Sequence, residues 1–355
     1  MRINHNFFSN LSFYLAENHL GKTNTNPSVG CVIVKNNSVI SSGVTSLKGR
    51  PHAEYNALNK KLNFSGCNMY VTLQPCAHYG QTPPCTNIIK KKRIKNVYYS
   101  FDDPDPRTFR KTKKNLYKSK ISFRKINFKN NDFYKCYFLN KNKQLPYLDA
   151  KIAISKDYFT ISKKSKWITN LRSRTATHLI RSKYDSILST SYSINKDNSL
   201  LNCRIEGFDN NKPDLIIIDR KLRLRKKLKL FSLPSKRKIY LFTSSNDKKK
   251  ISFFKKKKIK VIKIKDLKNK KDFFHLLKKI YQFGKRRVLI ETGLTFLKEL
   301  LKYNIINNMY IFRSSTKLNK NGYNNIKSDY LKKFSLNNKI NVNLNGDDLF
   351  KLRIK

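Results

Sequence analysis

The sequence has few cysteines, few acidic side chains and no long apolar run. Its six cysteines, at positions 31, 67, 76, 85, 136 and 203, are too sparse and uneven to form a disulfide scaffold in 355 residues, so we expect a reducing compartment. No window comes near the roughly 18 uninterrupted apolar residues of a membrane-spanning helix. The first 20 residues lack the apolar core and cleavage site of a signal peptide. These absences predict a soluble, cytoplasmic protein without a membrane partner.

Acidic residues are outnumbered: 22 Asp and Glu stand against 77 Lys and Arg, a formal net charge of +55. Such a charge would suit a nucleic-acid-binding protein, because clustered cations displace counterions from phosphates. However, the lysines are spread along the whole chain and accompany abundant Asn, Ile, Phe and Tyr, as strong A+T bias in the coding DNA would produce. We favour compositional drift, and no specific nucleic-acid partner, since net charge bears on solubility more than on fold.

The chain is about twice the usual domain length of ~150 residues, so we expect two domains, with one large domain as the alternative. The expected elements of the first part are a helix at 7–20, a hairpin at 30–45, a helix at 51–60 with Pro51 in its first turn, a strand at 68–73, a helix at 86–94 and a strand at 95–101. This order packs as a sheet covered by helices. The polar, basic stretch from 107 to 145 offers one weak strand, at 120–126, and we divide the chain into domains 1–145 and 146–355.

The second part alternates apolar strands with helices. Strands are expected at 147–155, 185–191, 214–220, 238–244, 260–264, 287–291 and 308–312. Helices are expected at 169–183, with Thr169 as the N-cap, at 271–283 and at 294–303. This alternation predicts an α/β domain built on a largely parallel sheet.

Four residues of the first part form a constellation suited to zinc chemistry. His52 and Glu54 stand at the expected start of a helix, Cys76 follows a strand, and Cys85 opens the next helix. One His and two Cys make a zinc shell with the fourth position open, which is typical of a catalytic site. Glu54 is too close to His52 to be a fourth ligand, but it can reach a bound water and pass its proton to a departing amine. A lone His or Cys is usually a cap or a core residue, whereas all four in this order are improbable by chance.

The motifs around these residues resemble a known enzyme family. His-Ala-Glu at 52–54 and Pro75-Cys76 match the H-x-E and P-C elements of zinc nucleobase deaminases, but eight residues separate Cys76 from Cys85 instead of two. The loop "PCAHYGQTPPC" (75–85) is similar to that of the bifunctional riboflavin-biosynthesis deaminase/reductases, as are "TNPSVG" (25–30), "GRPHAE" (49–54) and "DDPDPR" (102–107). The resemblance implies an N-terminal cytidine-deaminase-like α/β/α domain that deaminates a pyrimidine bearing a phosphoribosylamino group.

The resemblance also assigns roles in this first domain. His52, Cys76 and Cys85 would hold one zinc ion per chain, and Glu54 would be the acid/base. Asn26 and His78 would contact the pyrimidine or the ribose, and Asp103 would help to shape the pocket. Two positions depart from the family pattern: Gln74 replaces a Glu, and Gln81 replaces a Lys or Arg. The loss of a cation at position 81 should weaken a contact to the substrate phosphate, because charge-assisted hydrogen bonds are about twice as strong as neutral ones.

The second part resembles the reductase half of the same family, which has a dihydrofolate-reductase-like α/β fold. The similar segments are "KIAIS" (151–155), "SKWIT" (165–169), residues 178–204 and "LIETG" (289–293). They imply reduction of the ribosyl group to ribityl by NADPH. By analogy, the NADPH site would comprise Ala153, Trp167, Ser193, Asp197 and Gly293. The substrate would meet Ser165, Arg181, Leu201, Arg204 and Glu291, with the arginines gripping its phosphate bidentately, and Lys151 would be catalytic, near the hydride-transfer centre.

One reductase feature has a physical basis of its own. A buried strand that ends in Glu-Thr-Gly and runs straight into a helix presents backbone N–H groups where a phosphate can sit. It is not the G-x-G-x-x-G pattern, which disfavours a Rossmann domain.

The reductase half departs further from its family than the deaminase half. Tyr158 replaces a Gly that normally makes a turn, which could distort that loop, and Thr292 replaces the second Gly of Glu-Gly-Gly. Two alternatives therefore stay open: a deaminase whose second half has lost its activity, and a zinc deaminase acting on tRNA or another nucleic acid. The family commonly forms homo-oligomers, so self-association is possible.

Overall fold

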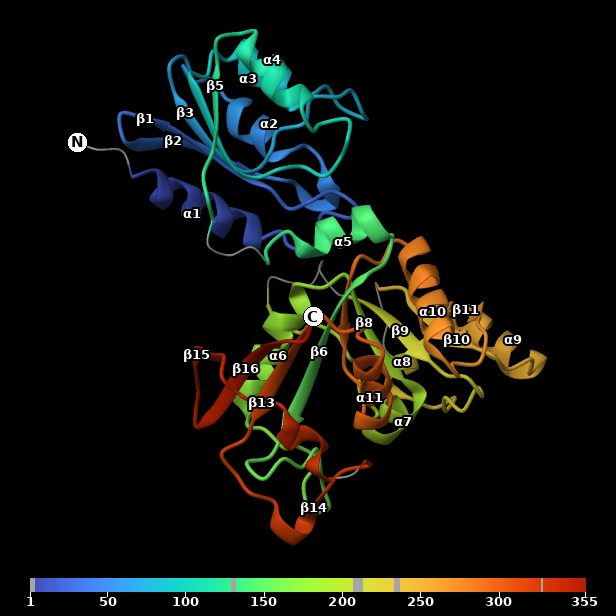
Figure 1. The fold of residues 1–355 in the computed structure, drawn as a ribbon. Helices are drawn as coiled ribbons and strands as arrows, with labels where there is room; N and C mark the ends of the chain where they lie inside the picture. Colours follow the sequence, from blue (N-terminus) through green and yellow to red (C-terminus); the bar gives the residue numbers. More distant parts are fainter. Residues whose placement is uncertain (1–3, 129–131, 207–212, 233–236, 327) are drawn as a thin grey trace. The chain divides into compact units, whose positions relative to one another are not determined.

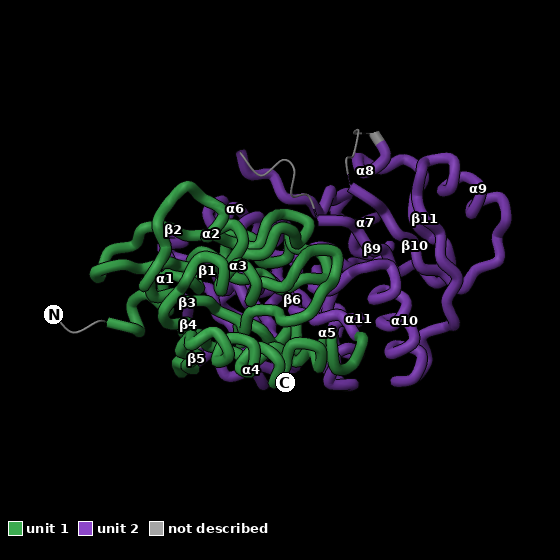
Figure 2. The backbone as a smooth tube through the Cα atoms, turned by 90° about the horizontal axis from the view of Figure 1, so that it is seen from above, with its two compact units in different colours: residues 1–144 green, residues 145–355 purple. Residues whose placement is uncertain are grey.

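The computed structural model describes residues 4–128, 132–206, 213–232, 237–326 and 328–355 (Figure 1). The chain divides into two compact units, residues 1–144 and 145–355, coloured separately in Figure 2. Within the described residues, no helix combines the length and the apolar character needed to cross a bilayer.

The first unit contains a five-stranded sheet in the order β2-β1-β3-β4-β5 (Figure 1). Its strands are β1 (Gly30–Lys35), β2 (Ser38–Val44), β3 (Asn68–Leu73), β4 (Asn96–Phe101) and β5 (Ser122–Lys125). Its helices are α1 (His5–Glu17), α2 (Ala53–Leu58), α3 (Cys85–Lys91), α4 (Lys111–Tyr117) and α5 (Lys135–Lys143), with a 3-10 turn at Leu47–Gly49. Strand β1 is antiparallel to β2 and β3, whereas β3, β4 and β5 are parallel.

The two faces of this sheet bury different helices, because successive strand residues point to opposite sides. Val32 and Val34 of β1 pack in one cluster with Phe8 of α1. The alternate residues Cys31 and Ile33 belong to the larger cluster that holds the apolar side of α2 and parts of α3 and α4. The unit is thus a helix–sheet–helix sandwich, as the sequence predicts.

The second unit contains a nine-stranded sheet in the order β11-β10-β9-β8-β12-β6-β13-β16-β15. Its strands are β6 (Tyr147–Ile154), β8 (Ser186–Thr190), β9 (Asp214–Ile218), β10 (Ile239–Thr243), β11 (Lys260–Lys263), β12 (Arg287–Ile290), β13 (Asn308–Arg313), β15 (Lys339–Leu344) and β16 (Asp347–Arg353); β7 (Ile161–Ser162) pairs separately with β14 (Gly322–Tyr323). Its helices are α6 (Leu171–Ser182), α7 (Ser191–Asp197), α8 (Lys229–Ser232), α9 (Lys248–Lys256), α10 (Lys270–Gln282) and α11 (Leu294–Lys302), with 3-10 turns at Asn319–Asn321 and Ser328–Lys333.

The strands from β11 to β13 are all parallel, and at one edge β16 is antiparallel to both β13 and β15. The apolar faces of α10 and α11 bury one side of the sheet, in the cluster that includes Leu276 and Leu297. Helices α6, α7 and α9 contribute Ile180, Ile194 and Phe254 to clusters on the other side. The prediction of a largely parallel sheet is therefore confirmed.

Two predicted helix starts are wrong by a short distance. Helix α6 begins at Leu171, and its N-cap is Asn170, whose Oδ1 accepts from Ser173 N at 3.0 Å; the predicted cap, Thr169, lies one residue earlier. Asn is the better cap because its carbonyl oxygen reaches the third helical N–H. Helix α2 begins at Ala53, so Pro51 precedes the helix instead of lying in its first turn.

Several elements were not predicted. They include α4 and α5 in the basic stretch before the second unit, the short helix α7, the lysine-rich helix α9, and the edge hairpin of β15 and β16. Lysine and asparagine fill most of their exposed positions, which weakens the apolar periodicity that marks such elements.

Candidate active sites

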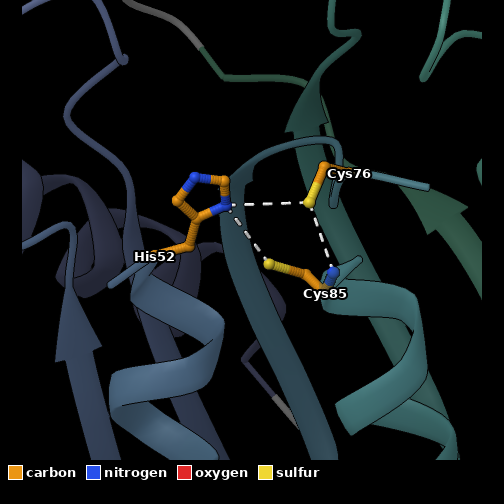
Figure 3. Close-up of side chains that lie close together, drawn as sticks. All are labelled: His52, Cys76 and Cys85. Atoms are coloured by element: carbon orange, nitrogen blue, oxygen red, sulfur yellow. Dashed lines mark hydrogen bonds between the residues drawn. The ribbon is translucent and has the colours of Figure 1, made fainter. Parts of the chain in front are cut away.

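Three side chains from separate elements converge in the first unit. His52 is the N-cap of α2, Cys76 follows β3 by three residues, and Cys85 is the first residue of α3. Figure 3 shows the imidazole and the two sulfurs facing one another, with the Cys85 backbone N–H donating to Cys76 Sγ at 3.2 Å. The end of the strand and the starts of the two helices therefore fix the three positions.

The distances within this cluster suit zinc. His52 Nδ1 lies 3.6 Å from Cys76 Sγ and 3.4 Å from Cys85 Sγ, and all three donor atoms lie within 4.8 Å of one another. A tetrahedral zinc with bonds of ~2.0 Å to nitrogen and ~2.3 Å to sulfur would separate the two donors by about 3.6 Å. Throughout the described ranges, no other trio of His, Cys, Asp or Glu meets so closely.

The two cysteines differ in their electrostatics. A hydrogen bond from the Cys85 thiol, with further help from His52, lowers the pKa of Cys76 to about 4. The same hydrogen bond and burial raise the pKa of Cys85. One thiolate is thus prepared before a metal binds, and a coordinated cation deprotonates the second thiol outright.

Glu54 lies beside the cluster, in the first turn of α2, and is 4% exposed. Burial is the main reason that its pKa rises to about 7, with His52 opposing and Cys76 adding to the rise. It is not one of the three close donors. A carboxyl group that exchanges its proton near neutral pH, next to a metal site, is suited to general acid/base chemistry.

The other predicted residues of this unit support the surrounding loops. Asn26 Nδ2 donates to the carbonyl of Gly49 at 2.8 Å, and His78 Nδ1 lies 3.1 Å from Thr108 Oγ1. The buried carboxylate of Asp103 accepts from Asp105 N and from Tyr137 Oη, both at 3.0 Å. These contacts hold the loops that flank the cluster.

Gln74, where the family pattern has a Glu, bonds the segment that follows β4. Its Oε1 accepts from the backbone N–H of Asp103 at 3.2 Å, an acceptor role that a carboxylate could equally fill. This departure from the family pattern therefore leaves the loop contact in place.

In the second unit, two predicted substrate residues pair with each other. Arg181 Nε lies 2.6 Å from Glu291 Oε1, and Nη2 lies 2.9 Å from Oε2, with the two side chains 12% and 9% exposed. Arg181 Nη1 also donates to the carbonyl of Asn202 at 3.0 Å. Two N–H donors of the Arg181 guanidinium already bind the Glu291 carboxylate. The predicted bidentate binding of a phosphate therefore does not fit Arg181.

Lys151 lies near this ion pair, on the central strand β6. Loss of hydration lowers its pKa, and the negative charge of Glu291 partly offsets that effect. Ala153 is two residues further along the strand and therefore lies on the same face.

A pocket of about 640 Å³ opens in the same unit, at the ends of β8, β9 and β12. Ser193 and Gly293, both predicted cofactor residues, line it, and Gly293 N donates to Ser193 Oγ at 3.1 Å. Gly293 is also the N-cap of α11, without a side-chain capping bond. Free helical N–H groups beside hydroxyl side chains form a favourable environment for phosphate.

The same pocket has basic residues that the sequence analysis missed: Arg220, Lys221 and Arg223 follow strand β9 and line one side. Their position directly after a predicted strand could have identified them, since ligands of open parallel sheets bind at the carboxyl ends of the strands. In a chain so rich in lysine and arginine, however, three more cations did not stand out.

The remaining predicted cofactor residues are not among those that line the pocket. Trp167 is 55% exposed and stacks under the guanidinium of Arg174, 4.8 Å from the ring centroid. Asp197 is exposed at the end of α7. Ala153 lies on β6, as described above.

The remaining predicted substrate residues lie in two segments. Ser165 Oγ bonds the backbone N–H and carbonyl of Trp167. Leu201 buries its side chain and offers only its carbonyl, which accepts from the buried Arg237 at 2.5 Å. Arg204 is exposed and donates to Asn202 Oδ1 at 2.8 Å. Arg237, which the sequence analysis did not single out, therefore holds the segment around Leu201 in place.

Tyr158 keeps the turn in which a Gly was expected. It adopts φ of 67°, and its N–H donates to the carbonyl of Ser155 at 3.0 Å. The loop is thus formed, with a bulky residue in the left-handed conformation that favours glycine.

Comparison with known proteins agrees with this geometry. Two family models match the chain: the cytidine and deoxycytidylate deaminase zinc-binding region over residues 3–101, and the RibD C-terminal domain over residues 146–318. The riboflavin biosynthesis protein RibD of Actinobacillus pleuropneumoniae is 31% identical over 306 residues, which cover 84% of this chain and 80% of that protein. The chain belongs to the RibD family. RibD of Buchnera aphidicola subsp. Baizongia pistaciae is 32% identical over 327 residues, covering 86% of each chain.

Solved RibD structures match both units together. Acinetobacter baumannii RibD, form 2, superposes with a TM-score of 0.81 at 26% identity, covering 98% of each chain. The diaminohydroxyphosphoribosylaminopyrimidine deaminase/5-amino-6-(5-phosphoribosylamino)uracil reductase of Thermotoga maritima gives 0.82 at 26% identity, again over 98% of each chain.

This RibD-family chain is an enzyme of riboflavin biosynthesis with deaminase and reductase activities. The predicted family, fold class and bifunctional activity are confirmed. Neither alternative is favoured, because the matches with RibD span both halves and none of those reported is a nucleic-acid-acting deaminase.

Proposed function

We propose that this RibD-family chain deaminates 2,5-diamino-6-(5-phosphoribosylamino)pyrimidin-4-one hydrolytically with zinc, and then reduces the ribosyl group of the product to ribityl with NADPH. The observation that carries the first step is the cluster of His52, Cys76 and Cys85 with Glu54 beside it. We assign the deaminase to residues 1–145 and the reductase to residues 146–355.

In the deaminase, His52, Cys76 and Cys85 hold the metal, and Glu54 moves the protons. Zinc, when bound, makes water nucleophilic at neutral pH. The Glu54 carboxylate accepts a proton from the attacking water and delivers it to the departing amine, so that oxygen replaces nitrogen on the ring and ammonia leaves. Asn26 and His78 contact the pyrimidine or ribose, and Asp103 holds the pocket loop through Tyr137 and Asp105.

In the reductase, the pocket beside Ser193 and Gly293 takes NADPH. Its free N–H groups and hydroxyls suit the pyrophosphate, and the cations that follow β9 suit the additional phosphate that distinguishes NADPH from NADH. Ala153, Trp167 and Asp197 complete the cofactor site by analogy with the family.

The substrate of the reduction lies toward Lys151 and the ion pair. Arg204, which is exposed, binds its phosphate, while Arg181 positions Glu291. Ser165 and the Leu201 segment complete the contacts. Lys151, whose pKa is lowered, is suited to supply a proton near the hydride-transfer centre.

The cytoplasm is the compartment that suits these chemistries. All six cysteines are free thiols in the structure, and two of them serve as proposed metal ligands, which a reducing compartment preserves.

The first step is tested by ammonia release from the proposed substrate with pure, zinc-loaded protein. Glu54→Gln should lower turnover by roughly 10²- to 10⁴-fold while zinc content stays the same, because the variant keeps the ligands but loses the proton carrier. Glu17→Gln, on the exposed face of α1, is the matched control and should retain full turnover. Substantial turnover by Glu54→Gln would remove Glu54 from its role.

The second step is tested by NADPH oxidation after addition of the deaminated intermediate. We expect oxidation that saturates with cofactor, and a preference for NADPH that falls in Arg220→Gln, because Arg220 lines the pocket. Absence of oxidation at saturating NADPH would favour a chain that only deaminates.

A further inference from the structure

The loop that carries the zinc-ligand cysteines is free of basic residues. From position 62 to position 89 the sequence contains no Lys or Arg, although 77 of the 355 residues are basic. Within this stretch, Gln81 is exposed and neutral. A phosphorylated substrate in the deaminase site therefore finds no cation on this loop.

One cation reaches the loop from outside. Arg50, just before the proline that precedes α2, donates from Nη1 to Thr82 Oγ1 at 2.5 Å. A Cβ built on Gly80 would lie 3.7 Å from Arg50 Nη2 and 4.0 Å from His78 Nε2. The guanidinium of Arg50 thus lies over residues 80–82, beside the proposed pyrimidine or ribose contact His78.

The position of Arg50 is also tied to the other proposed contact. Asn26 Nδ2 donates to the carbonyl of Gly49, the residue before Arg50. Arg50 therefore lies in the chain between two segments that the proposed reaction uses, and it is only partly buried.

The guanidinium has donors to spare. No carboxylate of the described residues pairs with Arg50. Its guanidinium donates one short hydrogen bond, to the neutral hydroxyl of Thr82. Its other close neighbour is His52 Nε2, at 3.5 Å. When Nδ1 of a neutral imidazole binds a metal, Nε2 carries the proton and cannot accept, so this neighbour offers no acceptor in the zinc-loaded site.

We propose that Arg50 binds the phosphate of the deaminase substrate and supplies the cation that the loop lacks at Gln81. This inference rests on the proposed function. A planar guanidinium offers parallel N–H donors that match two phosphate oxygens, and Thr82 holds one edge of it in place. Arg50 thereby selects the phosphorylated pyrimidine over its dephosphorylated counterpart.

The test compares wild type, Arg50→Gln, Arg50→Lys and the double variant Arg50→Gln/Gln81→Lys in ammonia release. Gln keeps a neutral donor for Thr82 but removes the charge. We expect Arg50→Gln to raise KM for the phosphorylated substrate roughly ten- to a hundredfold with kcat within about twofold. For the dephosphorylated substrate, kcat/KM should change by less than about twofold. Arg50→Lys should be intermediate, and the double variant should recover much of the lost affinity.

A chemical readout complements the kinetics. Phenylglyoxal modification of Arg50, followed by mass spectrometry of its peptide, should be slowed by the phosphorylated substrate. Arg124, exposed on β5, is the control and should react at an unchanged rate. Zinc content should equal that of wild type in every variant.

Two results would overturn the inference. Equal losses with phosphorylated and dephosphorylated substrates would make Arg50 a clamp for the loop, and an unchanged KM would remove it from the site. Both differ from failure of the proposed function, in which the zinc-loaded wild type itself would release no ammonia from the substrate.

Discussion

At the scale of single residues, the properties that matter come from neighbours far away in sequence. Arg181 and Glu291 are 110 positions apart and form a bidentate ion pair that is mostly shielded from solvent. Glu54 acquires a pKa of about 7 mainly because the fold buries it. Arg50 acquires its proposed role because residues 80–82 fold beneath it. Residue type alone reveals none of these states.

The ion pair predicts strong coupling between its partners. Arg181→Met leaves Glu291 buried without its cation and should destabilise the second unit by about 3–5 kcal/mol, since an unpaired buried charge is costly. Glu291→Leu should cost a similar amount, whereas the double variant should cost clearly less than their sum. Urea denaturation of the four proteins measures this. Simple additivity would show that the two side chains do not depend on each other.

His178 predicts a pH dependence of stability. Burial, with the positive charges of Arg181 and Arg204, lowers its pKa to about 4. The unfolded chain therefore binds more protons than the folded chain between that value and the ordinary pKa of about 6.5, so the free energy of unfolding falls as pH drops through this range.

Thermal unfolding at pH 7 and pH 5 measures this effect. His178→Asn should lose less stability between the two values than wild type does. His275→Asn, at an exposed site on α10, is the control and should keep the wild-type difference. An unchanged pH dependence in His178→Asn would contradict the assignment.

At the scale of helices and strands, the residues at which an element begins or ends depend on side chains that bond free backbone groups. The capping box of α10, formed by Asn269 and Asp272, and the Asn170 cap of α6 are examples. Asn36 and Asn37, with φ of 48° and 60°, close the hairpin of β1 and β2. The apolar periodicity predicted most cores of elements correctly, but the ends depended on these local bonds.

Asn170 predicts a measurable capping effect. Asn170→Ala removes the bond to Ser173 N and the bond from Nδ2 to the carbonyl of Leu344, and it should cost about 1–2 kcal/mol of unfolding free energy. Thr169→Val, which removes only a hydroxyl at the neighbouring position, should cost less. Chemical denaturation distinguishes them, and a larger effect at Thr169 would restore the cap that the sequence suggested.

At the scale of the whole molecule, the two compact units hold the two proposed sites separately. The cluster of His52, Cys76 and Cys85 lies in residues 1–144, and the pocket with Ser193 and Gly293 lies in residues 145–355. About two thirds of the basic side chains belong to the second unit, so the positive charge is not concentrated in the deaminase unit. This distribution agrees with compositional drift.

Metal removal should separate the two activities. Dialysis against a chelator should abolish ammonia release, because the cluster loses its ion, and NADPH-dependent reduction of added deaminated intermediate should persist. Zinc should restore ammonia release, and metal analysis at each stage is the control. Parallel loss of both activities would show that the reductase depends on the metal.

The sequence by itself determined the family, the order of most strands and helices, and the residues proposed as zinc ligands, because local motifs and apolar periodicity record them. Only the tertiary structure showed that Arg181 pairs with Glu291, that Arg220 and its neighbours line the pocket beside Ser193 and Gly293, and that Arg50 contacts the loop of Gln81. The physical reason is that the interaction energy of a charged side chain depends on the neighbouring charges and on its exposure to water. In a chain with 77 basic residues, only folding decides which cations are paired, which are solvated and which face a ligand.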